Sequence, residues 1–461
     1  MMLQKVKNAL FLLRWDAPFT KMVLRIALPM FVQNLVGQSL NLIDNLMVSH
    51  LGDAAYAGIS QASRYSLVAN VMLYGVYSGT GIFVAQYWGA KQISDMKKSN
   101  GLGMTVGLGI GLTVMILTLF GAEAIISLFL APGQSADYGA QYLRTIAFTF
   151  PLAAVTNSYA LLLRCEEKSK YPMIAGMIAV LCNTLLNYLL IEGRFGFPRL
   201  GVVGAGIATV ISAALCMLVL MYFGMRKSQS GRASLRELLG FDLSFVRKYI
   251  KTASPVMLNE TFWSIGVALF SVFYGMRGDQ SVAALGVFYS IDSIVLFSIY
   301  ALTGTTGVVV GKALGTKDNE LAMLYARRMM AGSLTLSMLM GTLVLLFVNP
   351  ILAVFGKLSD ETLHIAKLLV ILNAALVWTR SFNSTVIVGI LRAGGDTVAS
   401  MILDLVFLWG FALPLVGLAA TLTDWPIHLL YLLSLSDAVL KFLFGMRRFY
   451  SRKWIRNLTE A

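Results

Sequence analysis

Long apolar stretches recur along the whole chain and are separated by short polar segments. Because a helix needs roughly 20 apolar residues to cross the hydrocarbon core of a bilayer, this pattern predicts an all-α integral membrane protein. We expect twelve transmembrane helices, at residues 22–48, 55–88, 101–121, 137–163, 171–192, 202–225, 250–276, 281–311, 328–350, 362–391, 398–418 and 426–446. The second, eighth and tenth spans exceed a single crossing, which indicates tilted helices.

The two halves of the chain repeat one another in sequence. A shift of 226 residues aligns residues 26–53 with 252–279. The matches are Pro29 with Pro255, Gly52-Asp53 with Gly278-Asp279, Gly81 with Gly307, Gly89 with Gly315, Lys91 with Lys317 and, two residues further on, Leu163-Arg164 with Leu391-Arg392. Apolar residues match readily by chance, but Pro and Gly-Asp matches at one constant shift do not. Since six spans are an even number, the halves share one orientation, and we predict two six-helix bundles related by pseudo-twofold symmetry.

The only long polar stretch in the middle of the chain, residues 226–248, is basic and contains Gly and Ser. We therefore predict an amino-terminal bundle at residues 1–225, a cytoplasmic linker at 226–248 and a carboxyl-terminal bundle at 249–461 with a basic tail. Residues 1–20 show no cleavage site of the kind that ends a signal peptide, so we expect a short cytoplasmic segment there. The glycines between Gly101 and Gly111 indicate close helix packing.

Composition and charge agree with a membrane protein. Of the 461 residues, 57% are hydrophobic and 13% are charged, about half the charged share of a soluble protein. The net charge of +14 invites a nucleic-acid partner, but 29 of the 37 Lys and Arg fall on one side of the predicted topology. This is the positive-inside bias, so we expect both termini in the cytoplasm and no nucleic-acid partner.

Nothing in the sequence indicates an enzyme, a resident metal or a cofactor. The three cysteines have no metal-ligand spacing, and the three histidines lie near one predicted face, away from any nucleophile signature. The function must therefore be sought in the polar residues that interrupt the apolar spans.

The first span carries a polar stripe. Asn34, Gln38 and Asn41 follow one another at helical spacing, and Asp44 continues the same face. A carboxyl group within the bilayer is costly unless it faces a cavity or a partner, and desolvation would let it take up a proton near neutral pH. The alternative is a carboxylate that neighbouring amides satisfy and that only fixes packing.

Two further spans of the first half supply oxygen atoms. Asn183 and Asn187 lie one turn apart in the fifth span, and Thr209 lies in the sixth. Their amide and hydroxyl oxygens suit a small cation, or they join helices by hydrogen bonds.

The second half carries its own charged residues within the spans. Glu260 lies at the repeat position of Asn34, Asp292 in the middle of the eighth span and Arg380 deep in the tenth. Because lone buried charges are costly, we expect Arg380 to pair with Glu260 or with Asp292. Asp437 and Lys441, four residues apart, are expected to form a salt bridge.

Four segments together resemble the multidrug and toxic compound extrusion (MATE) transporters of bacteria: Asn41–Gly52, Gly201–Thr209, Pro255–Glu260 and Leu391–Thr397. Each is weak alone, but their order around the six-plus-six repeat is specific. The resemblance implies a cation-coupled antiporter that exports amphipathic, often cationic compounds by alternating access.

The resemblance also implies roles for particular residues. Asp44 matches the coupling acid of the first bundle, with Asn183, Asn187 and Thr209 clustered around it, and Glu260 matches a coupling acid of the second. Asn187 stands where some relatives have a second acid, which favours H⁺ over Na⁺. The tenth span also has no acid of the kind found in members that couple to sodium. The second bundle has therefore either formed an ion pair or lost its cation role.

We expect Asn34, Gln38, Asn41, Asp292 and Arg380 to line the substrate cavity. The partners are then a lipid bilayer and a small amphipathic substrate, and the protein is a monomer in the bacterial inner membrane. The alternative is a flippase for lipid-linked saccharides or peptidoglycan precursors, which the buried Arg64 and Arg380 support. A channel is less suited, because a twofold repeat supplies no ring of filter elements.

Overall fold

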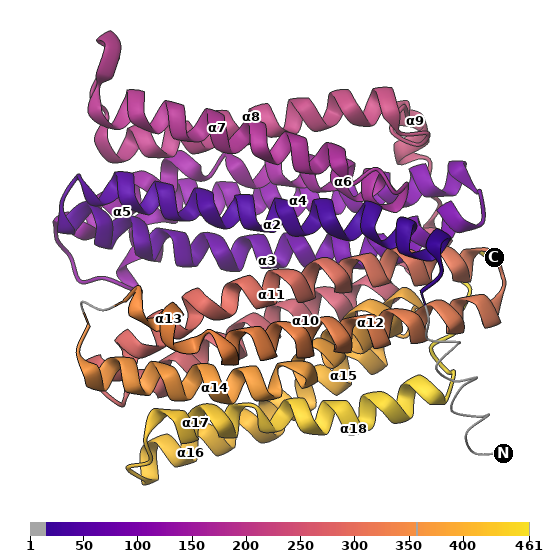
Figure 1. Ribbon diagram of the computed structural model, residues 1–461. Helices are drawn as coiled ribbons and strands as arrows, with labels where there is room; N and C mark the ends of the chain where they lie inside the picture. Colours follow the sequence, from indigo (N-terminus) through magenta and orange to yellow (C-terminus); the bar gives the residue numbers. More distant parts are fainter. Residues whose placement is uncertain (1–14, 356–357, 461) are drawn as a thin grey trace. The chain divides into compact units, whose positions relative to one another are not determined.

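The computed structural model describes residues 15–355 and 358–460, apart from the side chains of residues 41, 42, 45 and 235. The described chain is helical and contains no strand (Figure 1). Eleven helices are long and apolar enough to cross a membrane, and a twelfth crossing is a bent helix pair. The predicted fold class and number of spans are therefore confirmed.

The chain forms two compact units. The amino-terminal bundle comprises Leu24–Ala253, and the carboxyl-terminal bundle comprises the chain from Ser254 onward together with the described residues up to Val23. Two long helices, Ala17–Ser49 and Leu243–Gly275, cross these boundaries. In each of them the first turns belong to one unit and the rest of the helix belongs to the other. The domain boundaries predicted from the sequence, at residues 225 and 249, stay a prediction.

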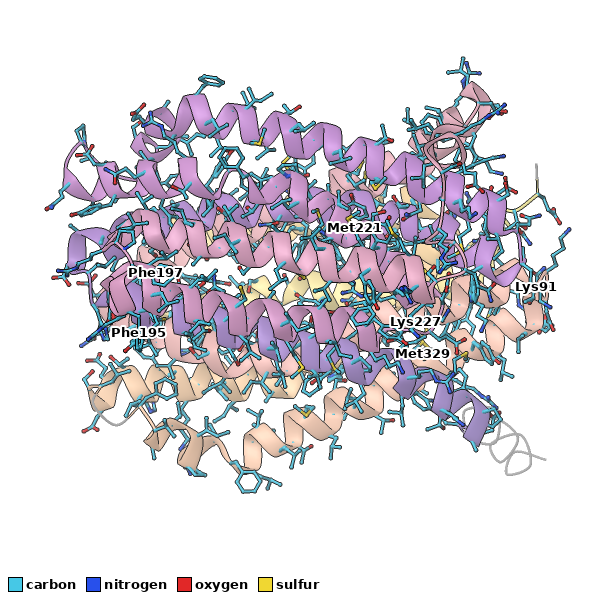
Figure 2. The ribbon with its side chains drawn as sticks, turned by 90° about the horizontal axis from the view of Figure 1, so that it is seen from above. Lys91, Phe195, Phe197, Met221, Lys227 and Met329 are labelled. Atoms are coloured by element: carbon cyan, nitrogen blue, oxygen red, sulfur yellow. The ribbon has the colours of Figure 1, made fainter. Side chains whose placement is uncertain are left out.

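The amino-terminal bundle consists of long helices joined by short connections. In chain order they are α2 (Ala17–Ser49), α3 (Asp53–Gly89), α4 (Ile93–Ser127), α5 (Gln134–Ile146), α6 (Thr149–Cys165), α7 (Lys170–Glu192) and α8 (Gly201–Lys227), with a short α9 (Leu235–Leu239). A 3-10 turn at Arg194–Gly196 lies between α7 and α8. Phe195 and Phe197 lie at one end of this bundle, and Lys91 and Lys227 lie at the other (Figure 2).

The fourth span, expected at residues 137–163, is a bent helix pair and not one continuous helix. It consists of α5 and α6, which meet at a bend of 45°. The cause is Pro151 in the first turn of α6. Proline lacks a backbone N–H and its ring clashes with the carbonyl four residues before it, here that of Ala147, so a continuous helix through this point is disfavoured.

The carboxyl-terminal bundle is less regular. Its helices are α10 (Leu243–Gly275), α11 (Asp279–Gly315), α12 (Asn319–Leu346), α13 (Val348–Ala353), α14 (Asp360–Asn383), α15 (Thr397–Phe407), α16 (Leu413–Leu422), α17 (Ile427–Ser434) and α18 (Ser436–Tyr450). Two π-helical segments interrupt the spans: Ser384–Leu391 continues α14, and Leu408–Ala412 joins α15 to α16.

The backbone repeats with the same shift as the sequence. α2 and α10 have 33 residues each, α3 and α11 have 37 each, and both pairs begin 226 positions apart. Gly52 and Gly278, which precede α3 and α11, have φ angles of 98° and 85°. Only glycine adopts this region without strain, which explains why the Gly-Asp pair recurs in both halves.

The linker is anchored by a buried carboxylate between α6 and α7. The hydroxyl groups of Ser228 and Ser230 donate to Oε1 of Glu166 at 2.6 and 2.9 Å, and Lys168 Nζ lies 2.8 Å from Oε2. Burial favours the neutral acid, but these hydrogen bonds and the ammonium outweigh it and lower the pKa of Glu166. The segment after the sixth span is therefore held against the bundle.

Candidate functional site

Asp44 lies in α2 and meets a row of polar side chains from α7 and α8. Asn187 Nδ2 donates to Asp44 Oδ1 at 2.5 Å and to Asn183 Oδ1 at 2.9 Å. Asn183 Nδ2 lies 3.5 Å from the hydroxyl oxygens of both Thr209 and Ser212. The structure thus brings together the acid and the three oxygen-bearing residues that the sequence grouped with it.

These amides are buried among apolar helices. Asn183 and Asn187 are 0% and 1% exposed, and Asn187 Oδ1 is buried without a hydrogen-bond partner in the protein. In the described chain, no Lys or Arg lies within salt-bridge distance of Asp44; its hydrogen bond comes from a neutral amide. A carboxylate in this setting can accept a proton or a small cation, because no fixed positive charge neutralises it.

The other residues of the polar stripe on α2 lie apart from the hydrogen bonds of Asp44. Asn34 and Gln38 are half-buried, and neither donates to nor accepts from Asp44 in any hydrogen bond seen within the described residues. The side chain of Asn41 lies outside the described residues. Their assignment to a substrate cavity stays a prediction. Ser212, which the sequence reasoning missed, lies three residues after Thr209 and so on the same face of α8.

In the carboxyl-terminal bundle, Arg380 pairs with Asp292. Arg380 Nη1 lies 3.2 and 3.1 Å from the two oxygens of Asp292, which is 3% exposed. Asn373 Nδ2 donates to the same carboxylate at 2.8 Å, and Asn373 Oδ1 accepts from Arg380 at 2.6 Å and from the Tyr431 hydroxyl at 2.8 Å. Of the two partners expected for Arg380, the structure selects Asp292.

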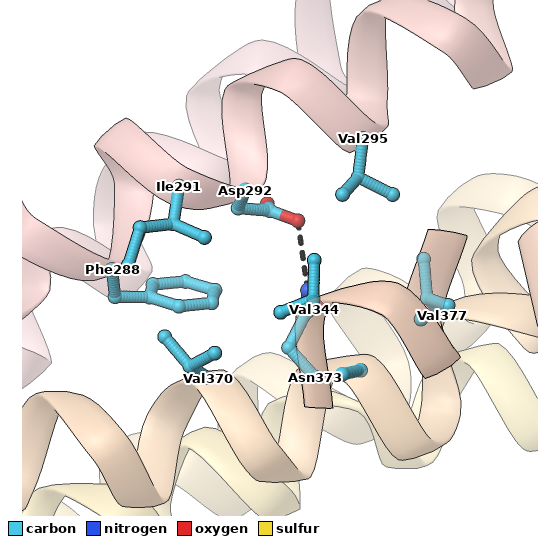
Figure 3. A pocket seen from close by; sticks show the side chains of 10 residues that line it. Phe288, Ile291, Asp292, Val295, Val344, Val370, Asn373 and Val377 are labelled. Carbon is cyan, nitrogen blue, oxygen red and sulfur yellow. Dashed lines mark hydrogen bonds between the residues drawn. The ribbon is translucent and has the colours of Figure 1, made fainter. Parts of the chain in front are cut away.

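Asp292 of this ion pair lines a mostly apolar pocket between α11, α12 and α14. Figure 3 shows Asp292 and Asn373 joined by their hydrogen bond, with Phe288, Val295 and Val344 among the apolar side chains around them. Asp292 and Asn373 are the only polar side chains among the residues that line the pocket. The charge of Asp292 is therefore satisfied within the bundle.

Glu260 has a partner that the sequence reasoning did not identify. Arg392 Nη1 donates to Glu260 Oε1 at 2.5 Å, and Arg392 is 2% exposed. In the first bundle, Arg164 at the matching position donates to Gln33 Oε1 at 2.9 Å. In both bundles an arginine at the end of the fourth span thus reaches the first span, but only the second bundle provides an acid.

A second charged group lies beside Glu260. Lys441 Nζ lies 2.6 Å from Asp404 Oδ1 and 2.7 Å from Asp437 Oδ2, and Asn259 Nδ2 donates to Asp404 Oδ2 at 3.0 Å. The predicted salt bridge between Asp437 and Lys441 is therefore present, and Asp404 in α15 joins it.

The comparison with known proteins bears on the whole chain. The sequence model of the MatE family matches residues 29–189 and 255–423, one stretch in each half. The chain belongs to the MatE family. This transporter-family member is 22% identical over 439 residues to the probable multidrug resistance protein NorM of Thermotoga maritima, covering 94% of this chain and 93% of that one. It is 26% identical over 419 residues to the multidrug resistance protein PmpM of Pseudomonas aeruginosa, covering 88% and 84%.

Solved structures of MATE proteins share the fold. A crystal structure of a MATE in complex with MaL6 superposes with a TM-score of 0.84 at 19% identity, covering 96% of this MatE chain and 98% of the other. The outward-facing conformation of a multidrug resistance MATE family transporter of the MOP superfamily gives the same score, identity and coverage. The family resemblance seen in the sequence motifs is therefore confirmed, and the protein is a multi-pass membrane protein of a bacterial transporter family.

Proposed function

We propose that this MatE protein is a cation-coupled antiporter that exports amphipathic, cationic compounds by alternating access, with Asp44 as the coupling acid. The carrying observation is the environment of Asp44: a carboxyl group inside a span, bonded to a neutral amide, with no basic partner among the described residues. The relatives NorM and PmpM are named as multidrug resistance proteins, which supports the substrate class.

The ion pairs of the other bundle favour Asp44 over Glu260 for this role. Glu260 is bonded to Arg392, and Asp292 is bonded to Arg380. A carboxylate held by an arginine resists protonation, because the guanidinium stays charged and stabilises the ionised acid. Asp44 has no such restraint and can change its charge state during each transport cycle.

The hydrogen bonds around Asp44 favour a proton over sodium as the coupling ion. Asn187 presents its N–H₂ group to Asp44, and in this orientation the amide donates to the carboxylate. A sodium site needs several oxygen ligands directed at one point, whereas a proton needs only the carboxylate itself. A neutral Asp44 then releases the charge that holds a cationic substrate, so proton and substrate compete.

The alternative function, a flippase for lipid-linked saccharides or peptidoglycan precursors, needs positive charge that is free to bind phosphates. Arg380 is engaged by Asp292 and Asn373, so of the two arginines only Arg64, exposed on α3, is left for this role. The flippase therefore has less support than the exporter.

We further propose that the protein is a monomer in the bacterial inner membrane with both termini in the cytoplasm. The test of the function is transport by the purified protein in liposomes, with a cationic dye as substrate and imposed proton or sodium gradients. A proton gradient is expected to drive dye exchange and a sodium gradient is not; exchange that ignores both gradients would contradict the proposal.

A further inference from the structure

The carboxyl-terminal bundle contains a buried group of charges that do not balance. Its acids are Glu260, Asp404 and Asp437, and its bases are Arg392 and Lys441. The pair of Asp292 and Arg380 is separate and neutral by itself. With every group ionised, the cluster therefore carries one excess negative charge within membrane-spanning helices, where an uncompensated charge is costly.

Two buried amide oxygens near these charges lack a hydrogen-bond partner within the described residues. Asn259 is 1% exposed and donates to Asp404, yet its Oδ1 has no hydrogen-bond partner in the protein. Asn383 is 8% exposed and donates to the carbonyl of Ala438, the neighbour of Asp437, and its Oδ1 also lacks a partner. Buried amide oxygens are normally paired, so the polar contacts around this cluster are incomplete.

The helices that carry the cluster are irregular close to it. The π-helical segment Ser384–Leu391 ends directly before Arg392, and Leu408–Ala412 begins four residues after Asp404. A break between α17 and α18 at Leu435 lies two residues before Asp437. Segments of π-helix inside α-helices occur frequently at functional sites, and here they surround the same charged side chains.

The partners of each acid identify the one that an added proton would occupy. Glu260 is bonded to the guanidinium of Arg392. Asp404 accepts from Lys441 and Asn259 and also lies in the field of Arg392. Asp437 contacts Lys441 and faces the buried phenol of Tyr274 from α10, which brings no positive charge. Asp437 has only Lys441, which it shares with Asp404, so Asp437 is the least compensated of the three acids.

We propose that Asp437 binds an exchangeable proton in the carboxyl-terminal bundle, with Lys441 shared between Asp437 and Asp404. Protonation of Asp437 removes the excess charge and leaves Lys441 bonded to Asp404 alone. This changes the tie between α18 and α15, because the ammonium no longer bridges two carboxylates. The proton site is independent of Asp44 and goes beyond the proposed function, since it adds a second titrating acid in the other bundle.

The test is infrared spectroscopy of the purified full chain as a function of pH, in the Asp44→Asn background so that Asp44 cannot contribute. A protonated buried carboxylic acid gives a carbonyl band that an ionised carboxylate lacks. We expect a band equivalent to about one proton per molecule, which follows from the charge count. Asp44→Asn,Asp437→Asn should lose the band, whereas the control Asp44→Asn,Asp424→Asn, which changes an exposed acid, should keep it.

Removing the base gives the opposite result. Lys441→Met leaves two excess negative charges, so the band should grow about twofold by the same count. If Lys441→Met does not fold, the double variant Asp437→Asn,Lys441→Met can be measured instead. It keeps one excess negative charge and should again show a carbonyl band of about one proton per molecule. A band that survives in Asp44→Asn,Asp437→Asn would overturn the proposal. So would a band that disappears when sodium replaces potassium, because the site would then bind sodium.

Discussion

At the scale of residues, the buried acids fall into two classes. Glu260, Asp292, Asp404 and Asp437 each contact an arginine or a lysine, whereas Asp44 contacts an amide. An acid with a base of its own is held in the ionised form, whereas an acid that shares its base, as Asp437 shares Lys441 with Asp404, is held less firmly. An acid without a base is free to change its charge. This distinction, and not burial by itself, supports the proposal that Asp44 is the coupling residue.

The ion pair of Arg380 and Asp292 can be tested by removing first one partner and then both. Arg380→Ala strands a buried carboxylate and should destabilise the protein by about 3–5 kcal/mol, because breaking one side of a buried pair leaves an uncompensated charge. Adding Asp292→Asn should restore much of the folded yield, measured by size-exclusion chromatography in detergent. The matched control is Arg380→Ala with Glu260→Gln, which should not rescue; equal rescue by both acids would show that the pairing is wrong.

The sequence predicted some of these residues and missed others for a physical reason. Asp44, Asn183, Asn187 and Thr209 could be grouped because each interrupts an apolar span. Arg392 was not recognised as a partner of Glu260, because it lies at the end of a span and reads equally well as a residue of the basic loop that follows. Which acid an arginine meets depends on helix packing, and periodicity along one helix does not contain that information.

At the scale of elements, glycines set the distance between α3 and α4. A Cβ atom added at Gly107 would lie 2.2 Å from the hydroxyl oxygen of Tyr77, which donates to the carbonyl of Ala154 at 2.6 Å. This agrees with the close packing expected for the glycines between Gly101 and Gly111. Gly109 in the same helix has nothing within 4 Å of such an atom.

Gly107→Ala should therefore destabilise the protein by roughly 1–3 kcal/mol, as overpacking of a tight contact does. Gly109→Ala should be neutral or slightly stabilising, since alanine favours helix more than glycine. Tyr77→Phe removes the clashing oxygen and should recover part of the loss in the double variant. Thermal unfolding in detergent measures all three, and equal midpoints for Gly107→Ala and Gly109→Ala would contradict the packing argument.

The positions of the spans followed from apolar windows, but their ends did not. α4 begins at Ile93, eight residues before the predicted span, because its first two turns are polar and continue the helix beyond the apolar window. The π-helical segments in the second half were also missed, since no residue pattern in the window distinguishes them from α-helix. Apolar length reports the part of a helix within lipid, and not the whole helix.

At the scale of the whole molecule, the internal repeat gives two bundles with different chemistry. The same backbone plan carries an uncompensated Asp44 in one half and a network of ion pairs in the other. The repeat could be read from Pro, Gly and Gly-Asp matches because these residues fix backbone turns. The polar side chains could not be transferred between halves, since Asn34 and Glu260 share a position but not a charge.

The proposed orientation predicts which ends of the amino-terminal bundle react with an impermeant thiol reagent in whole cells. In a variant without the native cysteines, Phe195→Cys, 86% exposed in the turn after α7, should be labelled from outside. Arg236→Cys, exposed on α9 in the linker, should react only after the membrane is opened. Labelling of Arg236→Cys in intact cells would reverse the topology that the basic loops predict.

The measurement that tests the central claim most directly is proton-driven exchange by Asp44→Asn in liposomes. Asparagine mimics the protonated acid in shape and charge, so the variant should fold and bind Asn187 but lose gradient-driven exchange by at least about 100-fold, the effect of removing a group that exchanges protons in each cycle. Glu260→Gln, measured alongside with equal amounts of monodisperse protein, should retain gradient-driven exchange. Near wild-type exchange by folded Asp44→Asn, together with loss in Glu260→Gln, would contradict the account and move coupling to the carboxyl-terminal bundle.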